Sequence, residues 1–115
     1  LSGCTVIHKR GAEGAFIGSE AGIQPVPGFS VRAVDTTAAG DVFHGAFNYA
    51  WLQGESAREC ARFSSAVSAI KCTRLGGRAG IPSVETVKKY MDTGEIDYSE
   101  IDKRVAHYKK GMFNF

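Results

Sequence analysis

The sequence predicts an α/β fold, and three of its features lead to that prediction. Short runs rich in β-branched residues lie near the start of the chain and are separated by glycine-containing turns. Helical spacing of apolar residues begins after a turn of small residues at 38–40 and recurs further along the chain. The 115 residues, 43% of them hydrophobic, suit one core of ordinary size. We therefore expect one globular unit in which helices follow strands.

Three strands are expected before the first helix. The runs at 4–8 and 15–18 are short, contain β-branched and aromatic residues, and are separated by glycines. The run at 30–34 follows Pro25-Val26-Pro27-Gly28, which we interpret as a break in regular structure. The expected order is therefore strand, glycine-containing loop and helix.

Two helices are expected in the middle of the chain. In the first, apolar residues expected in the core fall at helical spacing, and these are Phe43, Ala46, Phe47, Ala50 and Trp51. Gly54 is expected to end this helix. The second helix is expected to begin at Ser56, in a capping-box pattern, and to run to about Arg74. Its many alanines and serines favour close packing against a neighbour.

Two further helices are expected towards the end. After a glycine-rich loop at 76–80, Ser83 is expected to cap a third helix with one apolar face. Residues 92–115 are more polar, and apolar residues recur there at helical spacing behind Ser99, which we interpret as a cap. The end of the chain is therefore expected to be a short amphipathic helix.

Composition and charge argue against several classes of function. The net charge is +2 without a dense cluster of Lys and Arg, so nucleic-acid binding is not expected. No apolar stretch reaches the roughly 20 residues of a membrane span. Cys4, Cys60 and Cys72 are widely spaced, which favours buried thiols in a reducing cytoplasm over disulfides or zinc. The start at Leu1, without Met, suggests a fragment.

The turn Ala38-Ala39-Gly40 is expected to bind an anion. Its side chains are small, so backbone N–H groups at the start of the following helix can approach a ligand closely. The helix macrodipole adds partial positive charge at the same point. Asp41 would lie in the first helical turn, where a carboxylate can accept the proton of an attacking alcohol during phosphoryl transfer.

The same residues have a structural interpretation. Asp35 and Asp41 could be ordinary capping residues, because acidic side chains are favoured near helix N-termini for the same electrostatic reason. Composition and spacing leave both interpretations open.

Residues 34–47 closely resemble the second signature of the ribokinase, or phosphofructokinase-B, family of carbohydrate kinases. Flanking segments at 27–31 and 71–82 extend the resemblance, which covers residues 1 to about 91. Within the family, the sequence of the second segment is most similar to sulfofructose kinases and ribokinases. The resemblance implies the C-terminal part of a three-layer α/β/α fold. Residues 1–91 would be its nucleotide-binding portion, and 92–115 a polar helical tail.

The resemblance implies a role for particular residues. Asp41 would deprotonate a sugar hydroxyl, and Ala38, Ala39 and Gly40 would form the anion hole for the phosphoryl group of ATP, bound with Mg²⁺. Contacts to ATP would come from Gly11, Ala12, Glu13, Gly14 and, on the adenine side, Ser65. The loop at 11–14 could equally be a plain turn between strands, and Lys9-Arg10 departs from the family's usual Thr and apolar pair.

The resemblance also implies a monovalent cation, potassium in many relatives. Asp35, the Thr37 carbonyl and carbonyls of the loop at 72–80 would surround it. Oxygen ligands suit such a hard cation.

Members of the family are two to three times longer, and their sugar pocket lies in the N-terminal portion. We expect this chain alone to be inactive, because phosphoryl transfer would lack substrate positioning. Three interpretations remain open. The chain is part of a complete sugar kinase, a truncated nucleotide-binding module, or an unrelated α/β binding protein. The module would pair as a homodimer or with the missing N-terminal half, which would cover an exposed sheet edge.

Overall fold

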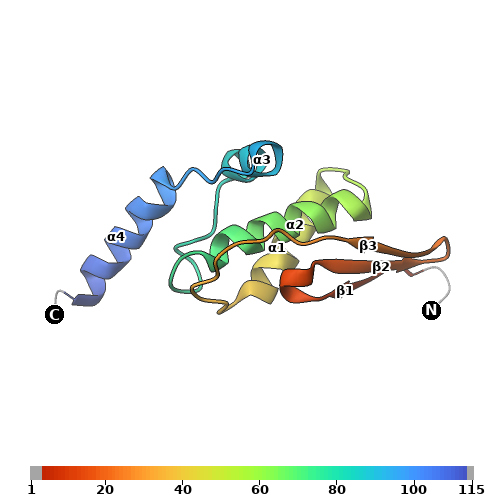
Figure 1. The fold of residues 1–115 in the computed structure, drawn as a ribbon, viewed down its shortest axis with the longest axis horizontal. Helices are drawn as coiled ribbons and strands as arrows, with labels where there is room; N and C mark the ends of the chain where they lie inside the picture. Colours follow the sequence, from red (N-terminus) through yellow and green to blue (C-terminus); the bar gives the residue numbers. More distant parts are fainter. Residues whose placement is uncertain (1–3, 114–115) are drawn as a thin grey trace.

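The computed structural model describes residues 4–113, which form a small sheet and a set of helices (Figure 1). The α/β class predicted from the sequence is confirmed. The strands are β1 (Val6–Lys9), β2 (Ala15–Ser19) and β3 (Gly22–Val26), and the α-helices are α1 (Ala39–Leu52), α2 (Ala57–Cys72), α3 (Val84–Thr93) and α4 (Ser99–Phe113).

The sheet is antiparallel in the order β1-β2-β3. Ile17 in the middle of β2 lies opposite Ile7 on one side and Gln24 on the other. A single 3-10 turn, Gly11–Glu13, joins β1 to β2. The first two predicted strands are therefore confirmed.

The third predicted strand is wrong. Residues 30–34 pair with no strand in the described part of the chain, whereas β3 runs through Pro25, within the segment interpreted as a break. Proline lacks a backbone donor and is tolerated in an edge strand, and β3 pairs only with β2 among the described residues. Phe29 and Val31 pack against the α2–α3 core instead of joining the sheet.

Helices α1 and α2 pack side by side and cover one face of the sheet (Figure 1). The core between the sheet and these two helices contains residues of β2, β3, α1 and α2, namely Ala15, Ile17, Val26, Phe43 and Ala61. The expected core position of Trp51 is wrong, because its side chain is 55% exposed. It stacks on Phe47 at the surface, with ring centroids 6.3 Å apart.

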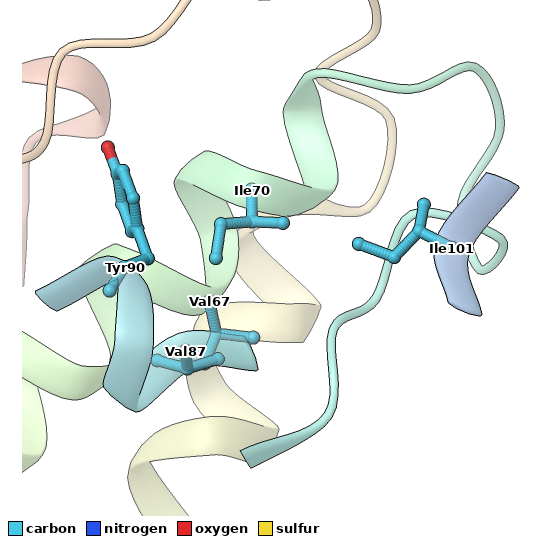
Figure 2. Close-up of a cluster of buried hydrophobic side chains, with 6 residues drawn as sticks. Val67, Ile70, Val87, Tyr90 and Ile101 are labelled. Atoms are coloured by element: carbon cyan, nitrogen blue, oxygen red, sulfur yellow. The ribbon is translucent and has the colours of Figure 1, made fainter. Parts of the chain in front are cut away.

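A second core joins α2 to α3 and to the start of α4. In Figure 2, Val67 and Ile70 of α2 meet Val87 and Tyr90 of α3, and Ile101 of α4 completes the cluster. The rest of α4 extends away from the body of the molecule, whose longest dimension is 55 Å (Figure 1). Helix α4 is therefore attached through its first two turns, where Ile101 and Val105 pack on this core and the Arg104 guanidinium donates to the Ile81 carbonyl.

Two of the three predicted serine caps are confirmed. The Ser56 hydroxyl accepts a hydrogen bond from the Glu59 N–H, and the Ser83 hydroxyl accepts one from the Thr86 N–H. The cap at Ser99 is wrong. Ser99 is itself the first residue of α4, and its N–H donates to the Asp97 carboxylate two residues earlier.

The prediction of buried cysteines is confirmed for two of the three. Cys60 and Cys72 are buried, as predicted, but Cys4 is exposed because it precedes β1 outside the core. Within residues 4–113, none of the helices is both long and apolar enough to cross a bilayer.

Candidate functional site

The site is built around the turn that precedes α1, and Asp35 holds that turn in place. Its carboxylate accepts hydrogen bonds of 2.8 Å from the N–H groups of Thr37 and Gly76. Hydrogen bonding from Thr37, by side chain and backbone, and then from Gly76 lowers the pKa of Asp35 from 3.8 to about 2. Asp35 thus connects the turn to the glycine-rich loop after α2.

Helix α1 begins with an unusual backbone. Ala38, its N-cap residue, has a φ of 61°, the left-handed conformation that costs a residue with a Cβ about 1–2 kcal/mol. The Ala39 N–H bonds to the Thr36 carbonyl at 3.1 Å, so one of the predicted anion-hole donors already has an acceptor. The N–H groups of Ala38, Gly40 and Asp41 have none within residues 4–113. Helix geometry directs such free N–H groups out of the helix start.

A cavity of about 340 Å³, here called the nucleotide-side cavity, opens between the loop after β1 and the start of α1. The predicted residues that line it are Gly11, Ala12, Gly14, Ala39, Gly40 and Ser65. The fold therefore brings the glycine loop, the helix start and α2 to one space. The Ser68 hydroxyl donates to the Ala39 carbonyl at 3.2 Å and fixes the start of α1 against α2.

Ser65 has an unused polar atom in this cavity. Its side chain is 8% exposed, and its Oγ has no hydrogen-bond partner in the described structure. Buried polar atoms are normally paired, so an orphaned one needs an explanation such as an absent ligand. The neighbouring Ser64 shows the usual situation, because its hydroxyl donates to the Cys60 carbonyl at 2.6 Å.

Lys9 adds a positive charge to the same cavity. Its ammonium donates to the Gly40 carbonyl at 3.2 Å and lies 5.7 Å from the centroid of the Phe43 ring. The sequence did not predict this placement. The available signal was a lysine at the end of the first strand, directly before the glycine-containing loop.

Glu13 is the predicted nucleotide contact that does not line the cavity. Its carboxylate pairs with the Arg10 guanidinium at 2.6 Å on the exposed side of the loop. A contact through the Glu13 backbone stays a prediction.

Asp41 lies on the other side of the helix start. With Ala38 it borders a separate cavity of about 420 Å³ between α1 and α3. The Asp41 side chain is exposed, and its carboxylate accepts no hydrogen bond from the described residues. It therefore does not cap α1, and neither does Asp35, since the N-cap residue is Ala38. The lining of this second cavity is mostly apolar, which does not suit a sugar.

The largest of these three cavities contains none of the predicted site residues. It measures about 730 Å³ and lies between residues 29–34 and the α3–α4 region. At its margin Arg74 bonds to Asp102 at 2.8 Å, and its guanidinium lies 3.6 Å from the centroid of the Tyr98 ring. The hydrogen bond with Asp102 raises the pKa of Arg74. This bond connects α4 to the segment that directly follows α2.

The predicted monovalent-cation site at Asp35 and Thr37 stays a prediction, but protein donors already approach the oxygens of Asp35. Both carboxylate oxygens of Asp35 already accept protein N–H groups, and the Asp35 carbonyl accepts the Lys71 ammonium at 2.9 Å.

Known proteins resemble this chain over most of its length. The family model described as pfkB family carbohydrate kinase matches residues 2–84. A ribokinase from Haemophilus influenzae is 38% identical over 88 residues, which cover 76% of this chain and 29% of that protein. The crystal structure of a ribokinase from Thermotoga maritima matches with a TM-score of 0.74 and 42% identity, over 77% of this chain and 30% of that one.

A third relative was solved with ligands. It is the aminoimidazole riboside kinase from Salmonella enterica, complexed with aminoimidazole riboside and an ATP analogue. The match has a TM-score of 0.71 and 26% identity, over 77% of this chain and 32% of that one. The chain thus spans about 30% of the length of the relatives it matches.

Proposed function

The chain belongs to the pfkB family of carbohydrate kinases, and from that premise we propose that it supplies the nucleotide site and catalytic base of an ATP-dependent sugar kinase. The chain spans about 30% of the length of its relatives. Kinase activity belongs to those longer proteins, and we extend it to this chain only as a proposal. We assign residues 1–91 to the nucleotide-binding portion and 92–115 to a polar helical tail. The reducing cytoplasm expected from the cysteines stays a prediction.

One observation carries the proposal. The glycine loop and the start of α1 line the same cavity, while Asp41 borders a different space at the same helix end. A nucleotide in the nucleotide-side cavity would have its phosphates near the free N–H of Gly40 and the Lys9 ammonium. Charge developing on the transferred group would meet fixed donors, which is the main way proteins stabilise phosphoryl transfer.

Asp41 is proposed as the base of this reaction. The oxygen of the sugar hydroxyl bonds to the γ-phosphorus, the bond from that phosphorus to the ADP oxygen breaks, and the hydroxyl proton passes to the Asp41 carboxylate. The carboxylate accepts no hydrogen bond from the described residues, so it is available for this proton. Bound with ATP, Mg²⁺ would neutralise phosphate charge, and we assign no step to it.

On the adenine side, we propose that Ser65 bonds to the nucleotide. The Ser65 Oγ is buried, has no hydrogen-bond partner among the described residues, and belongs to a residue that lines the nucleotide-side cavity. ATP and Mg²⁺ as ligands are supported by a related structure, described as a putative ribokinase II from E. coli in complex with both.

A second candidate is a nucleotide-binding module without catalytic activity. It is favoured by the exposed edge of β1, which pairs only with β2 among the described residues. An edge strand is a template for further pairing, so the module would form a homodimer or bind an N-terminal half.

Titration of the 115-residue chain with a non-hydrolysable ATP analogue and Mg²⁺ tests nucleotide binding. Gly40→Val is expected to lower the affinity at least about 10-fold, because a side chain there blocks close approach to the helix start. A Cβ at Gly40 meets only the Lys9 ammonium, at 3.5 Å, so the fold should survive. Gly45→Val is the matched control on α1, since a Cβ there meets nothing within 4 Å.

Asp41→Asn is a second arm of the titration. It should keep the nucleotide affinity within about two-fold, because Asp41 does not line the nucleotide-side cavity. In a longer kinase containing this segment it should abolish turnover. Saturable binding that Gly40→Val leaves intact would place the nucleotide elsewhere, and absence of binding by the unmodified chain would refute the proposal.

A further inference from the structure

Lys71, near the end of α2, is a buried cation without a carboxylate partner. It is 0% exposed and is the largest fully buried side chain in the described structure. Its ammonium donates to the Asp35 carbonyl at 2.9 Å, and no ion pair to it occurs within residues 4–113. Burial of a lysine is costly unless its charge is compensated, so this placement needs a physical reason.

The surroundings of Lys71 supply that reason. The next residue, Cys72, accepts hydrogen bonds at its carbonyl from the N–H groups of Val34 and Asp35, at 2.7 and 3.1 Å. Two neighbouring residues of α2 thus hold the backbone on both sides of Asp35. The Asp35 carboxylate then holds Thr37 and Gly76. The Lys71 charge also acts on that carboxylate, as one of the causes that lower the pKa of Asp35.

A bound monovalent cation would compete with this arrangement. It would need carbonyl and carboxylate oxygens in place of its hydration shell, and it would have to share those of Asp35 with the N–H groups of Thr37 and Gly76 and with the Lys71 ammonium. It would also lie close to the Lys71 ammonium and be repelled by it, more strongly in a buried place than in water. The turn therefore contains its own cation.

We propose that the Lys71 ammonium replaces the bound monovalent cation expected at Asp35 and makes the site independent of potassium. Lys71 is a positioning residue. It acts through the Asp35 carbonyl on the turn from Asp35 to Gly40, and so on the free N–H groups at the start of α1. The expected effect of Lys71 on nucleotide affinity rests on the proposed function. The replacement of the cation by Lys71 is independent of that function.

Two substitutions distinguish this role from plain packing. Lys71→Met keeps the length of the side chain but removes its charge, and it leaves no room for an ion. Lys71→Ala removes the charge and leaves space beside the Asp35 carbonyl. Lys88→Ala, at an exposed position of α3, is the control for loss of a lysine.

The first readout is the thermal midpoint of the 115-residue chain in potassium, methylammonium and tetramethylammonium chloride at equal ionic strength. The unmodified chain, Lys71→Met and Lys88→Ala are each expected to melt within about 1 °C in all three salts. Lys71→Ala is expected to melt lower, and to regain at least about 3 °C, saturably, in potassium or methylammonium relative to tetramethylammonium.

The second readout is affinity for the ATP analogue with Mg²⁺. Lys71→Met should bind at least about five-fold more weakly in every salt, and Lys71→Ala should recover affinity in potassium or methylammonium. If Lys71 only fills space, Lys71→Met will bind as tightly as the unmodified chain, and the proposal is wrong. Should Lys71→Ala fail to fold in every salt, the Met variant and the unmodified chain still decide the question.

Two further results would overturn the inference. One is a potassium-specific rise in the midpoint of the unmodified chain, which would reveal a cation site beside Lys71. The other is a folded Lys71→Ala that responds to none of the cations. If the unmodified chain binds no nucleotide in any salt, the proposed function fails, but the melting experiment still tests Lys71 because it needs no nucleotide.

Discussion

Ser64 and Ser65 are neighbours on α2 with opposite surroundings. The Ser64 hydroxyl is bonded to the Cys60 carbonyl, whereas the buried Ser65 Oγ has no protein partner in the described structure. We infer that a ligand supplies the missing partner. An unsatisfied buried hydroxyl costs stability, so its place beside the nucleotide-side cavity is better explained by binding than by folding.

Ser65→Ala is therefore expected to weaken binding of the ATP analogue about 2- to 13-fold, which corresponds to one hydrogen bond of about 0.5–1.5 kcal/mol. The free energy of unfolding should stay the same or rise, because no protein hydrogen bond is lost. Ser64→Ala should show the reverse pattern, with lower stability and unchanged affinity. Calorimetric titration and denaturant unfolding of the two variants check this. Equal affinities for Ser65→Ala and the unmodified chain would exclude Ser65 from the site.

Individual residues could be predicted to different degrees. The local pattern predicted that Gly40 and Asp41 lie at an open helix start, because small residues before a helix leave its N–H groups accessible, but their roles in catalysis came from the family resemblance. The positions of Lys9 and Lys71 could not be predicted in that way. Both meet the turn before α1 across 31 and 36 residues of sequence, and in the sequence a lysine within a helix usually indicates an exposed face.

Among the elements, the loop between β1 and β2 shows how closely the site is packed. Gly14 has a φ of 97°, and a Cβ there would lie 2.0 Å from the Val26 carbonyl oxygen. The loop is thereby pressed against the segment after β3, which brings its backbone to the edge of the nucleotide-side cavity. The glycine is required by both its conformation and its contacts.

Gly14→Ala is expected to lower the free energy of unfolding by at least about 2 kcal/mol, because it adds a backbone clash to the strain of a positive φ. Gly22→Ala is the matched control. Gly22 also has a positive φ, of 116°, but a Cβ there meets nothing within 4 Å, so it should cost only about 1 kcal/mol. Urea unfolding of both variants measures the difference. Equal losses would show that the close packing of the loop does not matter.

The helices were more predictable than the strands. Periodicity and serine caps located α1, α2 and α3, because both signals are local. The segment at 30–34 has strand-like composition, but a strand also needs a partner, and its apolar side chains pack on α2 and α3. Conversely, Pro25 concealed β3, which tolerates proline because it is an edge strand in the described sheet.

At the scale of the whole molecule, the start of α1 separates two spaces. The nucleotide-side cavity contains backbone donors, a lysine and an orphaned hydroxyl, whereas the cavity beside Asp41 is mostly apolar. The described residues thus offer several polar groups for a nucleotide, whereas Asp41 faces a cavity whose lining is otherwise mostly apolar. Such cavities form where segments distant in sequence converge. Family resemblance therefore predicted several of the lining residues, but the shape of the cavities could not be predicted from a single sequence.

Backbone amide shifts in an NMR titration of the 115-residue chain with the ATP analogue and Mg²⁺ test the central claim, that nucleotide binds between the glycine loop and the start of α1. We predict that the amides of residues 11–14 and 38–41 shift most. The amides of α4 should stay unchanged, because this helix extends away from the site (Figure 1). Shifts confined to the hollow between residues 29–34 and α3, or no shifts at saturating nucleotide, would contradict the claim.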